Sequence, residues 1–252
     1  MMKSFFELFL KGIPIGISNT LPGVSGGTMA LVLKIYERLI EGIRNIRLKI
    51  LIPIFLGGVT GVLVSSRLTT SLLDKYPELI TAFLFGLILA SSKVTAAEIN
   101  NFSIKNSILI FLGAFVAVIF TAGIQKAGNN NQIYLYQFLA GGFFGSMAMI
   151  LPGISGGTIL VMMGIYQPVL KAISGFNFKI ILIFGLGLVL GLLTISRVLS
   201  YFLNNYRTSM MALLTGLILG SLYSVIPQTF NIGIIMSFII GFLVIEVLRR
   251  YE

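Results

Sequence analysis

The chain carries one broken apolar stretch twice. Residues 21–36 read LPGVSGGTMALVLKIY and residues 151–166 read LPGISGGTILVMMGIY, an offset of 130 positions. In each copy a proline, three glycines and two hydroxyl residues interrupt apolar sequence. Non-helical backbone at membrane depth is tolerated only where protein buries it or water reaches it. A discontinuous helix repeated in both halves of a membrane chain is a strong sequence indication of a transporter's binding site.

The sequence around these motifs predicts an all-α polytopic membrane protein. The 252 residues are 56% hydrophobic and 10% charged, with a mean hydropathy of +0.99. Several apolar runs approach the length of about 20 residues that a helix needs to cross a bilayer. We expect full spans at 50–68, 79–97, 106–124, 180–199, 209–226 and 232–248.

The similarity between the two halves extends beyond the motif and predicts an internal duplication. At the same offset Gly57 matches Gly187, and the tetrapeptide at 86–89 recurs at 216–219. We therefore divide the chain into a first membrane repeat, 1–128, and a second, 129–252. The boundary lies within the polar linker 125–132. Each repeat is expected to hold an apolar segment, the motif, a half-length helix (29–43 in the first) and three spans.

The distribution of basic residues predicts that the two repeats are inverted. If each motif forms a re-entrant hairpin, each repeat crosses the membrane three times. With both termini cytoplasmic, the basic residues inside are Lys3, Lys11, Arg38, Arg44, Arg47, Lys49, Lys93, Lys105, Arg197, Arg207, Arg249 and Arg250. Those outside are Arg67, Lys75, Lys126, Lys171 and Lys179. A kinked span in place of each hairpin would divide the charges almost evenly, so the positive-inside rule favours the inverted arrangement.

Several classes of function are excluded or disfavoured by composition. The net charge of +10 comes mainly from residues at the ends of apolar runs, where they set orientation and meet membrane lipids, so nucleic acid is not an expected partner. The chain has no Cys and no His, which removes thiolate metal sites and the commonest general base and metal ligand. We expect no metal, no cofactor and no enzymatic activity. The oligomeric state is left open.

The motif itself predicts an anion site. Pro22 disfavours helix at the residue before it, and the glycines let the chain turn and let a ligand approach the backbone. A helix then begins with free N–H groups and hydroxyl donors, an arrangement that binds phosphate. The expected phosphate ligands are Ser25, Gly26, Gly27, Thr28, Ser155, Gly156, Gly157 and Thr158. If the two repeats are inverted, the two motifs would present these residues as symmetrical donors near mid-bilayer. The alternative is that the small residues of the motif only allow tight packing of helices.

Two pairs of charged residues are further candidates. Arg67 and Arg197 lie at equivalent places late in long apolar runs, and a guanidinium pairs well with phosphate. The alternative is that each arginine reaches the membrane interface from a helix end. Glu37 and Glu41 share one helical face and are candidates for coupling to a proton or sodium ion, with solvated carboxylates at a helix end as the alternative.

The doubled LPG[VI]SGGT…IY element resembles the signature of the bacterial polyprenyl-phosphate transporter family, the PopT-like undecaprenyl-phosphate translocases, formerly a membrane domain of unknown function. The resemblance covers nearly the whole chain. It implies a flippase of the bacterial cytoplasmic membrane that recycles the lipid carrier for cell-wall polymer synthesis, with re-entrant helices in inverted repeats. One departure is Lys34, where the family pattern has the glycine that Gly164 keeps.

The residues alone leave three functions open. The first is a translocase for polyprenyl phosphate. The second is a channel or carrier for a small soluble anion, since facing helix N-termini suit such ions equally well. The third is a membrane lipid phosphatase, which the lack of His and Cys disfavours because few residues remain for acid–base or covalent chemistry.

Overall fold

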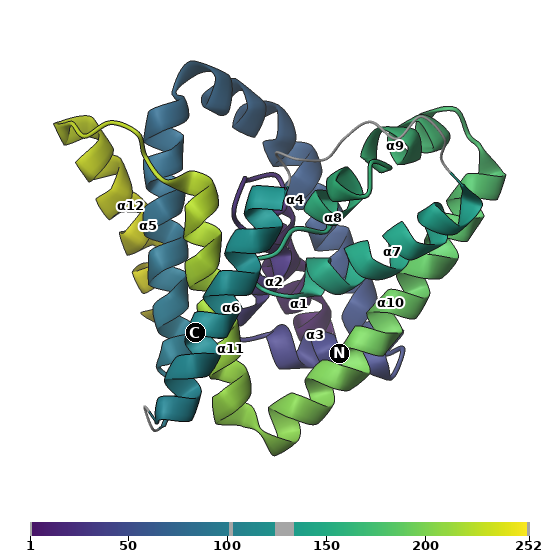
Figure 1. The fold of residues 1–252 in the computed structure, drawn as a ribbon, viewed down its shortest axis with the longest axis horizontal. Helices are drawn as coiled ribbons and strands as arrows, with labels where there is room; N and C mark the ends of the chain where they lie inside the picture. The colour runs from purple at the N-terminus through teal and green to yellow at the C-terminus, as the bar shows by residue number, and fades with distance from the viewer. Residues whose placement is uncertain (1, 101–102, 124–133, 251–252) are drawn as a thin grey trace.

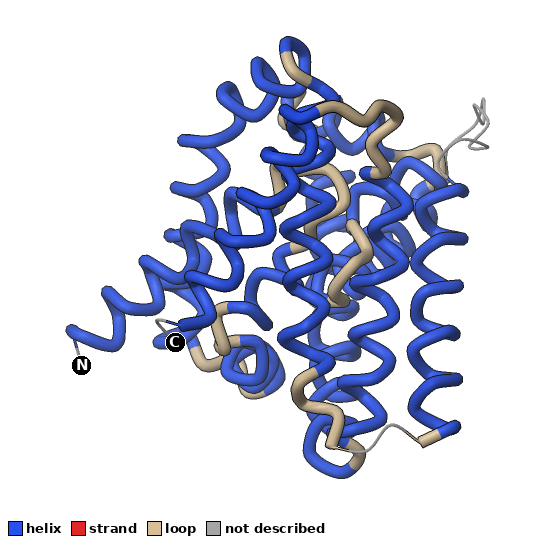
Figure 2. Tube along the Cα trace, turned by 90° about the vertical axis from the view of Figure 1, so that its left-hand side faces the viewer, coloured by secondary structure: helices blue, strands red, loops and turns tan. Residues whose placement is uncertain are grey.

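A computed structural model describes residues 2–100, 103–123 and 134–250, and every regular element in this part of the chain is a helix (Figures 1 and 2). The predicted all-α membrane class is therefore confirmed. The predicted linker 125–132 and the boundary between the repeats at 128 lie outside the described residues.

The helices fall into two series with the same order. The first series is α1 (Met2–Ser18), α2 (Gly26–Val32), α3 (Tyr36–Arg44), α4 (Leu48–Lys75), α5 (Pro77–Ala96) and α6 (Ile104–Gly123). The second is α7 (Leu135–Ile150), α8 (Gly156–Met162), α9 (Tyr166–Ser174), α10 (Phe178–Asn205), α11 (Arg207–Ser221) with the 3₁₀ turn η2 (Leu222–Val225), and α12 (Ile232–Arg250). The bounds of α8, α9 and α10 repeat those of α2, α3 and α4 at the sequence offset of 130.

Among the described residues, six helices are long and apolar enough to cross a membrane, and they correspond to the six spans expected from the sequence: α4, α5, α6, α10, α11 and α12. The protein is therefore a multi-pass membrane protein. Helices α4 and α10 have 28 residues each, a length of about 42 Å at 1.5 Å per residue. Since this exceeds the hydrocarbon thickness of about 30 Å, each of these helices is long enough to cross a membrane at a tilt.

The helices pair in a pattern that interlocks the two series (Figure 1). Within each series the first helix packs along the first long helix, α1 on α4 and α7 on α10. Between the series, α6 packs on α11 and α12 packs on α5. The third long helix of each repeat therefore lies against the second long helix of the other repeat, and the halves are not separate bodies.

Glycines at matched positions bring the paired backbones close together. A Cβ atom at Gly57 would overlap the carbonyl oxygen of Phe9 on α1, and one at Gly187 would overlap that of Leu139 on α7. Phe9 and Leu139 are themselves 130 residues apart. The duplicated glycines thus make the same helix contact in each repeat, as small residues do at membrane helix interfaces.

Each motif leads into two short helices where the sequence analysis expected one half-length helix, so that expectation is wrong. Lys34 separates α2 from α3 with a φ of 51°, and Gly164 separates α8 from α9 with a φ of 69°. A residue in the left-handed region ends a helix, and the axes of α8 and α9 meet at 107°. The start of α1 and the end of α12 lie toward the same end of the molecule in both views. The inverted orientation in a membrane stays a prediction.

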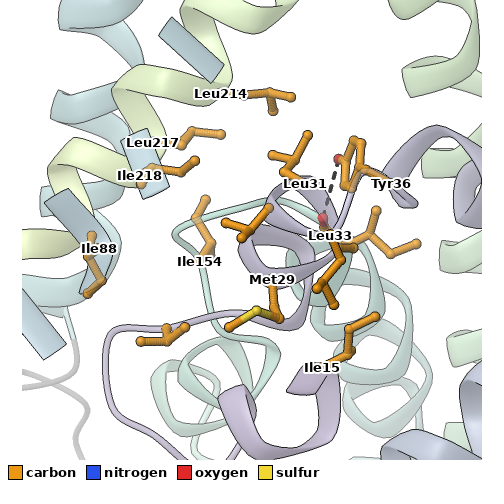
Figure 3. Packing of buried hydrophobic residues seen from close by; sticks show 14 of the residues in the cluster. Ile15, Met29, Leu31, Leu33, Tyr36, Ile88, Ile154, Leu214, Leu217 and Ile218 are labelled. Atoms are coloured by element: carbon orange, nitrogen blue, oxygen red, sulfur yellow. Dashed lines mark hydrogen bonds between the residues drawn. The ribbon is translucent and has the colours of Figure 1, made fainter. Parts of the chain in front are cut away.

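The buried core gathers around the first motif (Figure 3). Helix α2 is buried along its whole length. Met29, Leu31 and Leu33 pack in one cluster with Ile154 of the second motif and Leu217 of α11. The two motifs therefore meet inside the protein, although they lie far apart in the sequence.

Candidate functional site

A polar cavity of about 420 Å³ lies between the two copies of the motif. Its wall comes from Leu21, Pro22, Gly23, Val24 and Ser25 of the first copy and from Gly153, Ile154, Ser155, Gly156 and Thr158 of the second. Flanking segments add Asn19, Thr121, Met149, Ser221, Tyr223 and Ser224. The motif proline and the positive φ of Gly23 and Gly153, 75° and 76°, keep these segments out of helix, so that backbone and hydroxyl groups face the hollow.

The hydroxyl groups of the first motif are used inside the protein. Ser25 is the N-cap of α2, as predicted, and its Oγ accepts a hydrogen bond from the Thr28 N–H at 3.2 Å. The Gly153 N–H of the second motif also donates to Ser25 Oγ at 3.1 Å and to Thr28 Oγ1 at 3.2 Å. Both side chains are buried. The first motif therefore holds the backbone of the second.

The hydroxyl groups of the second motif face the cavity instead. Ser155 is the N-cap residue of α8 but makes no side-chain capping bond, and it is exposed. Within the described part of the chain, neither the Ser155 nor the Thr158 hydroxyl has a hydrogen-bond partner in the protein. The same sequence thus supplies structural hydroxyls in one copy and unpaired donors in the other, which differs from the symmetrical donors expected from the duplication.

One pair of matched glycines, Gly27 and Gly157, differs in the same way. A Cβ atom at Gly27 would overlap the carbonyl oxygen of Ile150, whereas one at Gly157 would meet nothing closer than 3.6 Å. The N–H of Gly26 donates to Asn19 Oδ1 at 3.0 Å, while Gly156 lines the cavity. Of the eight motif residues expected to bind phosphate, four line the cavity: Ser25, Ser155, Gly156 and Thr158.

The tyrosines that end the motifs repeat this asymmetry. Tyr36 is 2% exposed, and its hydroxyl donates to the Ile150 carbonyl at 3.3 Å (Figure 3). Tyr166, its counterpart, is 38% exposed. The first motif and its helices are therefore closely packed, whereas the second motif borders open space.

The structure does not bring the candidate arginines to the cavity. Arg67 on α4 and Arg197 on α10 both have exposed side chains, and neither lines the hollow. Their expected contact with phosphate stays a prediction, and the geometry favours the alternative in which each guanidinium reaches the interface from a long helix.

The two candidate coupling residues lie in ion pairs outside the cavity. Glu37 pairs with Arg207 at 2.7 Å, and the same guanidinium donates to Glu98 at 3.0 Å. Glu41 lies 3.9 Å from Arg47. The Arg207 cluster links α3 of the first repeat to the start of α11. A coupling role for Glu37 or Glu41 stays a prediction.

The described residues of the cavity wall carry no charge. Among the residues that line it, the polar groups are hydroxyls, the Asn19 amide and backbone groups, with no Lys, Arg, Asp or Glu. Within the described residues, no group of three or more Asp and Glu is placed to hold a metal ion. Such a site can donate several hydrogen bonds to an anion but offers no carboxylate as a general base and no cation as a fixed counter-charge.

Comparison with known sequences identifies the protein family of the chain. Residues 15–239 match the undecaprenyl phosphate translocase-like family. The chain belongs to this family. A polyprenyl-phosphate transporter of Vibrio cholerae is 36% identical over 244 residues, covering 89% of this chain and 78% of the relative. A polyprenyl-phosphate transporter of Staphylococcus aureus is 33% identical over 270 residues, covering 96% and 95%. No solved structure matches the chain.

Several polar residues of this family member's cavity were missed in the sequence analysis. Asn19 comes directly before the first motif, and Ser221, Tyr223 and Ser224 lie where α11 gives way to η2. The available signal was a polar cluster, SLYS at 221–224, near the end of an apolar span. The equivalent of Asn19 in the second repeat is Met149. Because the amide is not repeated, the duplication did not indicate that Asn19 lines the cavity.

Proposed function

We propose that this protein moves polyprenyl phosphate between the leaflets of a membrane, holding the phosphate in the cavity between the two motifs. The observation that carries the proposal is the pair of unpartnered hydroxyls, Ser155 and Thr158, on the wall of a polar cavity inside a bundle of apolar helices. Membership of the translocase-like family and the names of both relatives support the same substrate.

The donor set suits a carrier. A hydrogen bond to a charged acceptor contributes about 1.5–3 kcal/mol, so Ser155, Thr158 and the Gly156 N–H together offer enough to replace part of the phosphate's hydration. A fixed cation in the wall would bind the phosphate more tightly and slow its release, and none of the described lining residues is a cation. Transport requires binding that is favourable enough to admit the ligand and weak enough to release it. Helices α8 and α2 have seven residues each, so local donors contribute more here than the dipole of a long helix.

We further propose that the protein acts without covalent chemistry, in the bacterial cytoplasmic membrane with both termini inside. No cavity-lining residue is a carboxylate, and the sequence has no His or Cys. A proton or sodium gradient is the proposed source of directionality, and recycling of the carrier lipid for cell-wall polymers is the proposed role. The recycling role rests on the family resemblance, and the gradient rests on the candidate coupling residues Glu37 and Glu41.

The test is transport in liposomes with polyprenyl phosphate supplied to one leaflet. We expect protein-dependent movement to the other leaflet, and a loss of about tenfold or more in apparent affinity in the double variant Ser155→Ala, Thr158→Val. The control is Ser107→Ala, Thr70→Val, which removes two exposed hydroxyls that bond only to carbonyls of their own helices. An equal loss of apparent affinity in this variant and in the control would show that the Ser155 and Thr158 hydroxyls do not bind the phosphate.

Two further readouts separate the alternative functions. Release of inorganic phosphate from the added lipid would identify a phosphatase. Uptake of labelled inorganic phosphate, with no lipid movement under any imposed gradient, would identify a carrier or channel for a soluble anion. Either result would overturn the proposal.

A further inference from the structure

An apolar groove of about 620 Å³ adjoins the polar cavity. It lies between α6, α7, α8 and α11, and its wall consists of Leu112, Val116, Phe120, Phe144, Met147, Ala148, Leu151, Ile154, Ile159, Met162, Met163, Leu213 and Leu217. Every one of these side chains is apolar. Part of the groove is open to the surroundings, since Leu112 and Phe144 are about half exposed.

The groove and the polar cavity share a wall at the second motif. Ile154 lines both hollows. The neighbouring residues Ser155 and Gly156 face the cavity, while Leu151 and Ile159 face the groove. A ligand with an anionic head against Ser155 would therefore have its apolar part directed over Ile154 into the groove.

Within the described residues, the equivalent positions of the first repeat are filled or charged. Val32 and Leu33, the counterparts of Met162 and Met163, are 1% and 4% exposed and lie in the packed core. The counterpart of Val116 is Glu246, which forms an ion pair with Lys93. A groove that followed merely from the duplicated helix plan would occur on both sides. Within the described part of the chain, the groove lies beside the motif whose hydroxyls are unpaired.

We propose that this groove binds the isoprenoid chain next to the phosphate of the transported lipid, an inference that rests on the proposed function. Three methionines in the wall, Met147, Met162 and Met163, can adapt to a branched, irregular chain because their side chains are unbranched and flexible. The second motif then contacts both parts of the substrate: its hydroxyls bind the phosphate, and its apolar residues contact the isoprenoid chain. The groove supplies preference for an isoprenoid phosphate over inorganic phosphate.

A tryptophan reporter tests the proposal directly, because the native chain has no Trp. Phe144→Trp places the only indole in the groove. Phe111→Trp is the matched control, since Phe111 lies on α6 with 74% exposure and does not line the groove. We expect farnesyl phosphate to give a saturable change in the emission of the Phe144→Trp protein and none in the control, and inorganic phosphate to change neither.

A second variant fills the groove. Val116→Phe is expected to weaken binding of farnesyl phosphate by about tenfold, because each methylene kept out of the groove loses about fourfold in affinity. The matched control is Val189→Phe on α10, a half-exposed valine outside the groove, which should bind as the native protein does. Binding of the isoprenoid probe is measured by calorimetry in detergent.

The outcomes separate this inference from the proposed function. If farnesyl phosphate binds to the native protein but neither changes the Phe144→Trp emission nor responds to Val116→Phe, the groove assignment is overturned and the translocase proposal stands. If farnesyl phosphate does not bind at all, the proposed function fails as well. If phosphatidic acid displaces farnesyl phosphate from the reporter at equal concentration, the groove accepts any lipid chain and the isoprenoid assignment is wrong.

Discussion

The N–H of Gly153 donates a hydrogen bond to the hydroxyl of Ser25, 3.1 Å away, so the first motif holds the backbone of the second. Because both residues belong to copies of one sequence, this contact makes the copies unequal. Ser25 becomes part of the framework, and its counterpart Ser155 is left to face the cavity.

Ser25→Ala is expected to lower the free energy of unfolding by about 1–2 kcal/mol, because it removes the N-cap of α2 and one acceptor for the Gly153 N–H. Ser155→Ala is expected to change it by no more than about 0.5 kcal/mol, because the exposed hydroxyl bonds to nothing in the protein. Thermal unfolding of both variants in the same detergent makes the comparison. Equal destabilisation would contradict the asymmetry.

The motif glycines should respond unequally to alanine. Gly27→Ala places a methyl group against the Ile150 carbonyl and the Pro152 nitrogen, and backbone shifts of that kind cost about 1–3 kcal/mol. Gly157→Ala has room, since the nearest atom, Ser155 Oγ, is at 3.6 Å. The check is the melting temperature of each variant with its folded yield. A tolerated Gly27→Ala would mean that the two motifs do not pack as described.

Lys34→Gly is expected to stabilise the protein by about 0.5–1 kcal/mol. Lys34 holds a φ of 51°, a conformation that costs a residue with a Cβ atom about 1–2 kcal/mol, and the greater freedom of glycine in the unfolded chain offsets part of that gain. Lys34→Ala keeps the backbone cost and serves as the control for loss of the exposed ammonium group. A melting temperature below that of the native protein in both variants would assign the lysine side chain a stabilising contact, and a drop in Lys34→Gly alone would contradict the predicted backbone strain.

The double variant Arg67→Gln, Arg197→Gln should bind farnesyl phosphate within about threefold of the native affinity, because neither guanidinium lines the cavity. The measurement is calorimetric binding, with Ser155→Ala, Thr158→Val as the positive control for loss. A drop beyond tenfold would bring the arginines to the phosphate in another conformation and restore the role that the sequence predicts for them.

Inverted repeats require equivalent positions to face opposite sides of the membrane. Lys49 and Lys179 are both exposed at the starts of α4 and α10, and the native chain has no Cys. We expect an impermeant maleimide added to intact cells to label Lys179→Cys and not Lys49→Cys, and to label both after permeabilisation. Labelling of both, or of Lys49→Cys alone, in intact cells would overturn the predicted topology.

The amino-acid sequence was sufficient for the class of fold, the six spans, the duplication and the break at each motif. These follow from local properties: apolar runs of bilayer length, a proline that cannot continue a helix, and glycines that admit a positive φ. The N-cap role of Ser25 was predictable for the same reason. The split of each motif helix was missed, because Lys34 is an uncommon residue in the left-handed conformation that divides it.

Only the tertiary structure decided which copy of the motif uses its hydroxyls in the framework and which leaves them unpaired at the cavity. Ser25 and Ser155 have nearly the same neighbours in the sequence, so local preferences cannot distinguish them. What distinguishes them is the surroundings that the interlocked helices provide: the Gly153 N–H beside Ser25, and an open polar cavity beside Ser155. Hydrogen bonding and burial depend on atoms far away in the chain, and the same short sequence can therefore stabilise the fold in one place and offer a binding site in the other.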